Sequence, residues 1–420
     1  MEEWKEIALH DLTSFVIGGD WGGSPEEATE NSTLAYCIRG SEIKEWNKNK
    51  GKTAVIRRIK KSSLEIRKLD VGNILLEISG GGPEQPVGRV LYIDEDVLDT
   101  EDNLPLVCTN FFRKLQLVDS VCRKYVYYYL HYFYISGKTI GLQGGSNNLR
   151  NLKYKDYQMI KIPLPPLEEQ KQIAAKLDKL FAQIETIKKS TERIPELLKN
   201  FRQQILTYAV TGKLIECTPE LRMLGELIYE LKYGTSKKAD YDVDGYPVLR
   251  IPNINKGKID SSDLKYAKLD EKEYNQLALK EGDILVIRSN GSLSIVGQSA
   301  IIEKDLENWV YAGYLIRIRC GSELLPEYLN YIFQSYQVRK QIVEKSHSMS
   351  GVNNFSADKI KQLEIAWYPI EVQKQIVDKI GTLFFKLNEI EKQYNVLCEK
   401  LEKLPQVLLY KAFKGELLTK

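Results

Sequence analysis

The sequence has few of the residues from which catalytic and metal sites are usually built. Its three histidines, His10, His131 and His347, are isolated from one another. Its six cysteines are scattered and form no CxxC pair, which argues against a zinc site or a disulfide scaffold and for reduced thiols in a cytoplasm. We therefore expect the histidines to be structural or surface residues, and we predict no metal site.

Motifs for membrane insertion, nucleotide binding and base methylation are also missing. No apolar run approaches the roughly 18–20 residues of a membrane span, and the first residues, MEEWKE, are too charged for a signal peptide. Two GKT triplets, at 51–53 and 137–139, lack the upstream glycine that a phosphate-binding loop requires. An Asn/Asp-Pro-Pro-aromatic motif, expected where an exocyclic base amine is methylated, is absent. The prediction is a soluble, cytoplasmic protein that is not an enzyme by itself and binds no cofactor of its own.

Charge is nearly balanced overall but unevenly distributed along the chain. The formal net charge is only +3 in 420 residues, so nucleic-acid binding does not follow from the total. Between Lys44 and Lys68, however, there are ten basic residues against two acidic ones, whereas residues 94–102 hold six acids and no base. This segregation predicts a basic face and an acidic face on the first globular unit, although either run alone is as consistent with a solvated loop.

What the sequence does contain is a duplication. Residues 166–173 (PLEEQKQI) return as residues 369–376 (PIEVQKQI), and residues 209–214 (AVTGKL) return as residues 412–417 (AFKGEL). Both returns come 203 residues later, so the stretch between them carries no insertion or deletion. A period near half the chain length indicates a tandem pair of modules, which suits a protein that holds two things at a fixed separation.

Each copy of the repeat contains a long stretch with heptad spacing. Apolar residues recur in steps of four and three over 173–208 and again over 376–411, with one polar exception in each copy. This spacing places a narrow apolar stripe on one helix face, which a partner helix must cover. The predicted coiled-coil positions are Ile173, Leu177, Leu180, Ile184, Ile187, Ile194, Leu198, Phe201, Ile376, Ile380, Leu383, Leu387, Ile390, Leu397, Leu401 and Leu404.

The two predicted helices begin at the prolines of the PLEE and PIEV motifs and end at Gly212 and Gly415. Each is therefore about 46 residues, or roughly 70 Å, long. Pro195 and Pro405 lie inside them and predict a kink near each proline. The ends of a compact domain commonly lie close together, so the helices are predicted to run antiparallel as a coiled coil, with one globular unit at each end.

The segments outside the helices repeat less faithfully. GNILL at 72–76 matches GDILV at 282–286, but the offsets drift elsewhere, so the framework is shared while the loops differ in length. Mixed strands and helices make each unit α+β. The predicted segments are a first globular domain at 1–162, a first coiled-coil helix at 163–214, a second globular domain at 215–366 and a second coiled-coil helix at 367–420.

This pattern resembles the DNA specificity subunit of type I restriction–modification systems over essentially the whole chain. The resemblance is carried by the helix entry IPLPPLEEQ at 162–170, by the exit ending in GKL at 212–214, and by the duplicate VQKQI at 372–376. The second entry departs from the family pattern, because AWYP at 366–369 replaces the double proline. The resemblance implies two target-recognition domains, each reading one half of a bipartite, asymmetric double-stranded DNA target, and two helices that set the unread spacer.

The same resemblance implies the partners of the chain. Two methyltransferase (modification) subunits would dock on the helices, and ATP-driven restriction and translocation subunits would cleave the DNA. S-adenosylmethionine, ATP and Mg²⁺ would be bound by those subunits, which would methylate adenine. The chain itself would be a prokaryotic, non-catalytic specificity subunit.

Recognition of duplex DNA requires cations for phosphates and planar donors for base edges. If the two units read different half-sites, features that they share should position the backbone, and unshared loops should specify bases. Arg39 and Arg250 are shared, so they are predicted to contact phosphate, with a structural ion pair equally possible. Arginine can pair bidentately with guanine, and asparagine with adenine. The predicted readers are Lys48, Lys50, Lys52, Arg57, Arg58 and Lys60 in the first unit and Lys256, Lys258, Arg288 and Asn290 in the second.

Other polar and aromatic features are expected to be structural. The run YVYYYLHYFY at 125–134 could stack on bases, but its helical spacing favours a core with a tyrosine rim. The repeated Asn-Asn pairs at 147–148 and 353–354 are expected to be caps or turns. A competing hypothesis is a scaffold or adaptor on a coiled-coil rod, whose two end domains bind proteins and have no DNA role. The segment rich in lysine and arginine favours the DNA-binding hypothesis.

Overall fold

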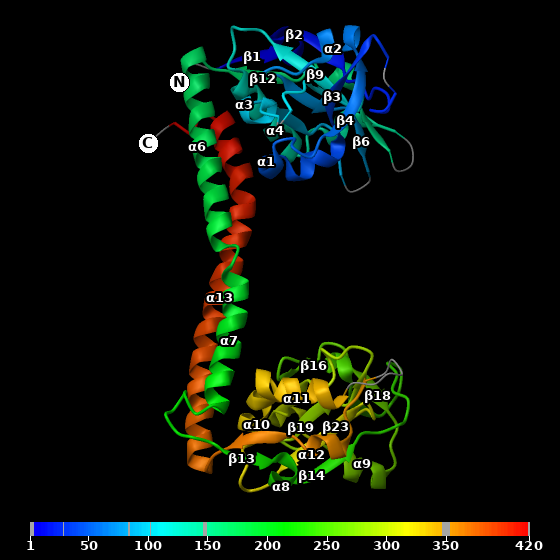
Figure 1. Cartoon of the computed structure of the whole chain (residues 1–420), viewed down its shortest axis with the longest axis vertical. Coiled ribbons are helices and arrows are strands. Elements are labelled where there is room, and N and C mark those ends of the chain that lie inside the picture. Colours follow the sequence, from blue (N-terminus) through cyan, green and yellow to red (C-terminus); the bar gives the residue numbers. More distant parts are fainter. Residues whose placement is uncertain are drawn as a thin grey trace. The chain divides into compact units, whose positions relative to one another are not determined.

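The computed structural model describes residues 4–27, 29–82, 85–100, 102–145, 149–346 and 353–418 (Figure 1). The chain forms two compact units, Met1–Thr191 with Leu397–Lys420, and Glu192–Val396. Each unit therefore combines one globular domain with parts of the long helices. The four-segment division made from the sequence cuts the chain differently, at the helix entries and exits, and stays a prediction.

The first globular domain is organised around two sheets. One is antiparallel, in the order β2 (Thr13–Gly18), β9 (Phe112–Leu117), β5 (Ile74–Glu77), β7 (Val90–Tyr92). The other has the order β4 (Val55–Lys60), β3 (Ser32–Ile38), β8 (Leu106–Cys108), with β3 and β8 parallel. The central strand β5 is buried along its whole length, as expected of the GNILL segment.

Smaller pairings and short helices complete the first domain. Strands β10 (Gln143–Gly144), β11 (Arg150–Leu152) and β6 (Ser79–Gly81) form one small sheet, and β1 (Lys5–Ala8) pairs with β12 (Lys161–Leu164). The α-helices are α1 (Trp46–Asn49), α2 (Lys61–Arg67), α3 (Glu95–Leu98), α4 (Arg123–Ile135) and α5 (Tyr154–Tyr157). Three 3-10 helices are η1 (Leu9–Leu12), η2 (Gly40–Glu45) and η3 (Ile140–Leu142).

The tyrosine run lies on α4 and is core with a rim, as predicted. Tyr125 and Tyr128 are 0% and 5% exposed. The Tyr125 hydroxyl donates to the Pro163 carbonyl at 2.6 Å, which ties α4 to the strand that leads into the long helix. Burial raises the pKa of Tyr125, Tyr128 and Tyr129, so these phenols stay neutral donors.

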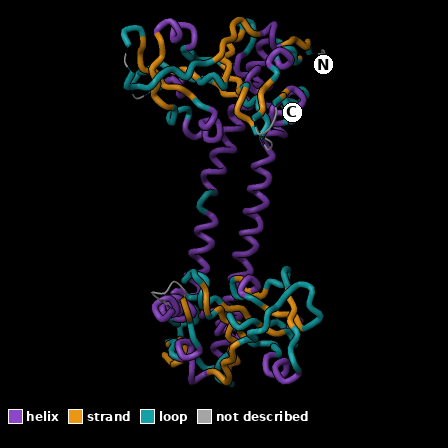
Figure 2. Tube along the Cα trace, turned by 90° about the vertical axis from the view of Figure 1, so that its right-hand side faces the viewer, coloured by secondary structure: helices purple, strands orange, loops and turns teal. Residues whose placement is uncertain are grey.

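The second domain repeats the two sheets. The antiparallel sheet has the order β14 (Ile228–Tyr233), β23 (Leu315–Cys320), β19 (Ile284–Ile287), β21 (Ser299–Ile301). The mixed sheet has the order β18 (Lys265–Ala267), β15 (Tyr246–Leu249), β22 (Val310–Tyr311), again with one parallel pair. Figure 2 shows strands and helices interleaved in each domain, which confirms the predicted α+β class.

Short pairings and helices surround these sheets as well. The pairs are β13 (Glu220–Met223) with β25 (Glu364–Trp367), β16 (Ile254–Asn255) with β17 (Lys258–Ile259), and β20 (Ser289–Asn290) with β24 (Asn353–Asn354). The α-helices are α8 (Leu224–Leu227), α9 (Glu271–Leu277), α10 (Pro326–Phe333), α11 (Tyr336–Ser346) and α12 (Ala357–Lys361). The 3-10 helices are η4 (Ile251–Asn253) and η5 (Lys304–Leu306).

The first long helix is interrupted, contrary to the prediction of one helix with a kink. It forms α6 (Leu167–Thr191) and α7 (Ile194–Val210), with Pro195 in the first turn of α7. Proline has no backbone N–H and disfavours helical backbone at the residue before it, so it suits a helix start better than a helix interior. The second long helix, α13 (Ile370–Phe413), continues through Pro405 without interruption.

Contacts within each unit show that the paired helices run in opposite directions. In the first unit the Lys176 ammonium donates to the Leu417 carbonyl at 2.7 Å. In the second, Lys379 donates to the Leu214 carbonyl at 3.0 Å, and Arg202 of α7 pairs with Glu391 of α13 at 2.9 Å. The start of one helix thus meets the segment that follows the end of the other, as the antiparallel arrangement requires.

The apolar stripe of the long helices is buried at some positions and exposed at others. Four predicted coiled-coil residues are substantially exposed, which contradicts a stripe covered along its whole length: Ile187 at 40%, Phe201 at 52%, Ile390 at 47% and Leu404 at 37%. Beyond Leu198 and Leu401, the buried positions lie one residue later than the heptad spacing predicts. They are Leu206 and Ala209 in the first copy, and Leu409 and Ala412 in the second. These positions follow the 3.6-residue period of a straight helix whose face joins a domain core, rather than the 3.5-residue period of a supercoil.

Of the remaining predicted stripe positions, seven are buried: Ile173, Leu177, Ile184, Leu198, Ile376, Ile380 and Leu401. The other five are partly buried: Leu180, Ile194, Leu383, Leu387 and Leu397. Ile173, Leu177, Ile376 and Ile380 join the domain cores and anchor the helices to them. Pairing of the helices as a coiled coil stays a prediction.

A buried glutamine fastens each long helix to its domain at an equivalent point of the two repeats. Gln170 donates to the Pro165 carbonyl at 2.8 Å and accepts from the Cys122 amide, which caps α4, at 3.0 Å. Gln373 donates to the Tyr368 carbonyl at 2.7 Å and accepts from the Leu325 amide, which caps α10, at 2.8 Å. The repeated QKQI motif therefore encodes a junction between a helix entry and the amino end of another helix.

Candidate nucleic-acid interface

The two arginines of β4 support the fold of the first domain. Arg57 donates to the Trp21 carbonyl at 3.1 Å, and its guanidinium lies 4.3 Å from the centre of the Trp21 ring. Arg58 donates twice to the Pro25 carbonyl, at 3.1 and 3.0 Å. Both side chains are half-buried, so they hold the loop over residues 20–25 rather than project freely.

The lysines of the same segment are more accessible. Lys48, Lys52 and Lys60 are exposed, and in the described part of the chain no ion pair or hydrogen bond of their ammonium groups is found. Lys50 differs, because its ammonium lies 2.8 Å from the Asp94 carboxylate. The basic segment and the acidic segment therefore meet at this point, and the predicted separation into opposite faces does not hold there.

The shared arginines Arg39 and Arg250 are engaged in ion pairs. Arg39 lies 2.6 Å from the buried Glu42 carboxylate, and Arg250 lies 2.9 Å from Asp263. The backbone amide of each arginine also donates to the side chain three residues on, Glu42 or Asn253. This geometry favours the structural ion pair, the alternative to a phosphate contact.

The candidates of the second domain lie in two places. Lys256 and Lys258 are exposed on the β16–β17 hairpin. They line a groove of about 1120 Å³ together with Lys199 and Arg202 of α7 and the hydroxyl-bearing Ser261. Asp260 and Glu391 also line the groove, and Glu391 pairs with Arg202. Lys199, Lys256 and Lys258 are the groove's cations that remain suited to phosphate oxygens.

Arg288 directly follows β19, and Asn290 ends the short strand β20. The Arg288 guanidinium stacks over Tyr233 with 4.7 Å between their centres, and Asn290 Oδ1 accepts from the Ser292 amide at 2.9 Å. Asn353 and Asn354 form strand β24, which pairs with β20, so the expectation of a cap or turn is wrong for this pair. The Asn353 side chain donates to the Asn290 carbonyl at 3.4 Å. The equivalent pair at 147–148, like His347, lies outside the described residues.

One cation at a comparable site was not predicted. Arg113, at the start of β9, stacks over Tyr154 with 4.3 Å between their centres, much as Arg288 stacks over Tyr233. In both arginines the Nε atom is buried and, within the described ranges, has no hydrogen-bond partner. The sequence carries no signal for this similarity, because the stacking tyrosines come from different elements of the two domains.

Four of the predicted readers belong to a repeated sequence motif that the prediction did not use. The tetrapeptide NKGK occurs at 49–52 and again at 255–258, each time in the connection that follows a shared arginine. In both copies the lysine and the glycine have positive φ: 48° and 78° at Lys50 and Gly51, 46° and 87° at Lys256 and Gly257. Four of the predicted readers thus belong to one repeated local structure.

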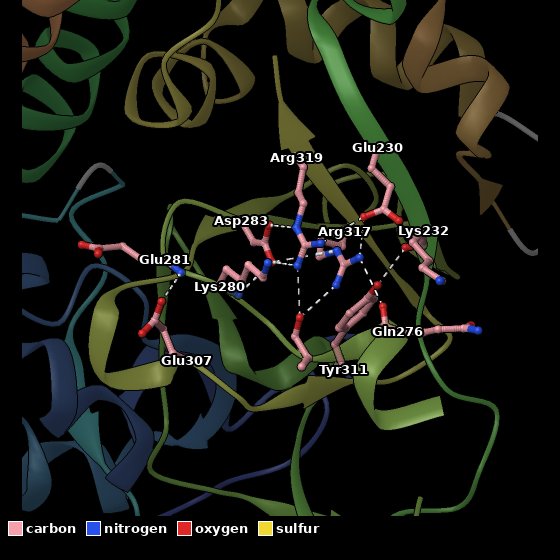
Figure 3. A network of polar contacts seen from close by, with 11 residues as sticks. Glu230, Lys232, Gln276, Lys280, Glu281, Asp283, Glu307, Tyr311, Arg317 and Arg319 are labelled. Carbon is pink, nitrogen blue, oxygen red and sulfur yellow. Dashed lines mark hydrogen bonds and ion pairs between the residues drawn. The ribbon is translucent and has the colours of Figure 1, made fainter. Parts of the chain in front are cut away.

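A network of polar contacts in the second domain joins Glu230, Asp283, Arg317 and Arg319 (Figure 3). Arg317, 1% exposed, lies 2.6 Å from Glu230, and Arg319 pairs with Asp283 at 2.7 Å. Arg317 also donates to the Ala278 carbonyl at 3.1 Å, at the end of α9. The equivalent residue of the first domain, Lys114, donates to the Lys68 carbonyl at the end of α2. Both domains thus place a buried cation at a helix C-terminus, where the helix dipole favours it.

Three of the thiols are held in their neutral form by burial. Burial, with Asp20 nearby, raises the pKa of Cys37 to about 12, and burial raises that of Cys108 and of Cys320 to about 12 as well. No cluster of three His, Cys, Asp or Glu side chains that could hold a metal is found among the described residues. None of the described helices combines the length and the hydropathy that crossing a bilayer requires.

Comparison with known families assigns both copies of the repeat. The model of the type I restriction modification DNA specificity domain matches residues 1–196 and again residues 220–399. The chain belongs to this family. The predicted family and the predicted pair of target-recognition domains are thereby confirmed.

Individual relatives of the specificity family agree. The chain is 37% identical over 290 residues to the EcoKI specificity subunit of Escherichia coli, a match that spans 67% of this chain and 62% of that one. It is 30% identical to the StySPI specificity subunit of Salmonella potsdam over 367 residues, or 84% of this chain and 76% of that one. The HsdS subunit of Thermoanaerobacter tengcongensis has the same fold, with a TM-score of 0.66 at 16% identity over 99% of this chain and 98% of that one.

Proposed function

We propose that the chain is the non-catalytic DNA-recognition subunit of a type I restriction–modification system. Each of its two domains reads one half of a bipartite, asymmetric duplex target. The observation that carries this proposal is the repeat itself: two specificity domains share their sheets, their helix junctions and a buried cation, and differ in the loops around them. A shared framework with unlike loops is what reading two unlike half-sites requires.

Comparison of the two domains separates residues that contact DNA from residues that support the fold. Arg288 and Asn290 stand where the matching segment of the first domain has Ile78 and Gly80, so they are the better candidates for base contacts in the second domain. Arg57, Arg58, Arg39 and Arg250 act as supports for neighbouring loops. In the first domain, Lys48 and Lys60 remain candidates for contact with DNA.

Catalysis belongs to partner subunits in this proposal. Methyltransferase subunits bind S-adenosylmethionine, and restriction subunits bind ATP and Mg²⁺, while this chain positions both on the target in the cytoplasm. The exposed apolar side chains of the long helices, among them Ile187, Phe201 and Ile390, offer a surface on which such partners could dock.

DNA binding by the purified full chain tests the proposal. Binding to random duplex should weaken steeply as salt rises, because each neutralised phosphate releases counterions. Methylome sequencing of the source cell should reveal a bipartite methylated motif, and a duplex carrying that motif should bind more tightly than a scrambled one. A salt-independent response, or equal binding to motif and scrambled duplexes, would contradict the proposal.

A further inference from the structure

The NKGK segments are type I′ turns in equivalent connections of the two domains. Each lies between the strand that ends at the shared arginine and the edge strand of the same mixed sheet, β4 in one domain and β18 in the other. In the first copy the Lys52 amide donates to the Asn49 carbonyl at 2.8 Å, and in the second Asn255 pairs with Lys258 across the hairpin. The two turns are therefore one structural device used twice.

A lysine at the first turn position is unfavourable for the backbone alone. Type I′ turns need positive φ at both central residues, and asparagine followed by glycine is the preferred pair. Among the described residues only five that are not glycine have positive φ, and Lys50 and Lys256 are two of them. A residue held in such a conformation at the same point of both domains indicates that its side chain is used.

Each turn is held rigidly by the domain beneath it. In the second domain the Gly257 carbonyl accepts from Asn330, a buried residue of α10, at 2.8 Å. Gly257 has φ 87°, a backbone conformation that favours glycine over residues with a Cβ. In the first domain Arg39 donates to the Thr53 carbonyl at 3.4 Å, just after the turn. The shared arginine therefore supports the turn instead of contacting the ligand.

We propose that the NKGK turn of each domain binds DNA phosphates and reads no bases. This rests on the proposed function and reassigns four predicted readers. Two domains that recognise different half-sites need the same element only for what all DNA has in common, the backbone. The groove beside the second turn adds Lys199 and the hydroxyls of Ser261 and Ser262, which suit phosphate, while its Glu391 is paired with Arg202 and its Asp260 is acidic. Lysine is depleted at protein–protein interfaces.

The two turns contribute unequally. Lys256 and Lys258 have no ion-pair partner in the described part of the chain, so the second turn neutralises two phosphates. In the first turn Asp94 already neutralises Lys50, so Lys52 alone is available there. The inference therefore predicts that loss of the second turn's lysines weakens DNA binding more than loss of Lys52, and that loss of Lys50 has no effect. A nonspecific effect of positive charge would be the same for each lysine removed.

Equilibrium binding of the full chain to two duplexes tests the inference. One duplex carries the motif found by methylome sequencing, the other a scrambled motif, and salt is varied from about 50 to 300 mM. The test variant is Lys256→Asn with Lys258→Gln, in which asparagine keeps the preferred turn conformation. Lys272→Gln, an exposed lysine of α9, is the matched control.

The double variant should bind both duplexes about tenfold more weakly at low salt, with the ratio between them unchanged and the salt slope less steep by about 2. Lys52→Gln should lower the slope by about 1, and both Lys50→Asn and the control should leave it unchanged. Loss of discrimination between the duplexes would overturn the inference in favour of base reading. Unchanged binding with weakened capture of the methyltransferase subunits would overturn it in favour of protein docking. If the unaltered chain binds no duplex, the proposed function fails first.

Discussion

Buried charge is the clearest residue-scale difference between the two domains. The first domain places a single lysine, Lys114, at the end of α2, where the second places Arg317 and Arg319 against Glu230 and Asp283. An arginine offers a planar fork that one carboxylate and one carbonyl can share, so it can hold more partners than a lysine. In the second domain, four charged groups are therefore linked in one network at this point.

Asp283→Asn should destabilise the second domain by about 3–5 kcal/mol, because it leaves two half-buried or buried guanidinium groups without a full counter-charge. Urea unfolding followed by hydrogen exchange in β19 measures the loss. Glu371→Gln, which breaks an exposed pair with Lys374, is the control and should change stability by less than about 1 kcal/mol. Equal effects of the two substitutions would contradict the role given to the network.

Acid should destabilise the first domain through His131, which stacks on Tyr127. Burial lowers the pKa of His131 from 6.5 to about 4, so the unfolded chain takes up a proton that the folded chain does not. The free energy of unfolding should then fall as pH is lowered from about 6.5 to about 4, and level off below that. His131→Gln should flatten this slope in a urea–pH series, whereas His10→Gln, at an exposed site, should keep it.

Single charged residues were the part of the site that the sequence predicted least well. Composition located the basic segment, but whether a cation is free depends on partners far along the chain. Arg57 finds the Trp21 carbonyl, and Lys50 finds Asp94, through folding that no local pattern records. Arg113 was missed for the same reason. The repeated NKGK turn could have been found, since it needs only the comparison that revealed the long helices.

At the scale of elements, the junction between domain and long helix is the most faithfully repeated structure. Gln170 and Gln373 make corresponding hydrogen bonds, and Tyr125 and Tyr328 donate to the strand that enters the helix at 2.6 and 2.7 Å. The two copies of the repeat are most alike in sequence at these junctions, where both copies make the same hydrogen bonds. This explains why the helix entries were predicted correctly.

Gln373→Ala should cost about 2–3 kcal/mol, because the Leu325 amide and the Tyr368 carbonyl would lose a buried partner. Gln375→Ala, an exposed glutamine on the same helix, should be nearly neutral. The measurement is urea unfolding of each variant against the unaltered chain. A difference of less than about 1 kcal/mol between the two variants would show that the glutamine is not a structural junction.

The interruption between α6 and α7 is assigned to Pro195, and the repeat supplies a matched test. The equivalent residue of α13 is Cys398, inside an unbroken helix. Pro195→Ala should join the two helices and raise hydrogen-exchange protection at 192–195. Cys398→Pro should break α13 and cost about 3 kcal/mol or more. Persistence of the break in Pro195→Ala would assign it to the surrounding packing instead.

At the scale of the whole molecule, the repeat predicts a ruler. One added helical turn of four residues within 173–208, matched by the same insertion in α13, lengthens the helix pair by about 6 Å, close to two base pairs. Methylome sequencing should show a longer spacer between unchanged half-sites. The same insertion in the loop between β14 and β15 should leave the spacer unchanged. Altered half-sites in the helix variant would contradict the ruler.

The architecture was largely predictable, and its failures have a physical cause. Heptad spacing located both long helices, but it also predicted burial of Phe201 and Leu404, which are exposed. The spacing of apolar residues identifies the helix face that can be buried. Which residues of that face are buried depends on how the helix packs against its domain. Leu206 and Ala209 join the core of the second unit, and this shifts the buried face by one residue.

The composition of the two compact units has a consequence for protein synthesis. The second unit, Glu192–Val396, is one continuous segment, whereas the first needs Leu397–Lys420 as well as Met1–Thr191. Phe413 packs against Tyr125 and Tyr129, with ring centres 5.4 and 5.0 Å apart. Those tyrosines therefore lack their cover until Phe413 has been synthesised, which happens after the whole of the second unit. We expect the domain that is translated first to complete its packing only after the second domain has been translated.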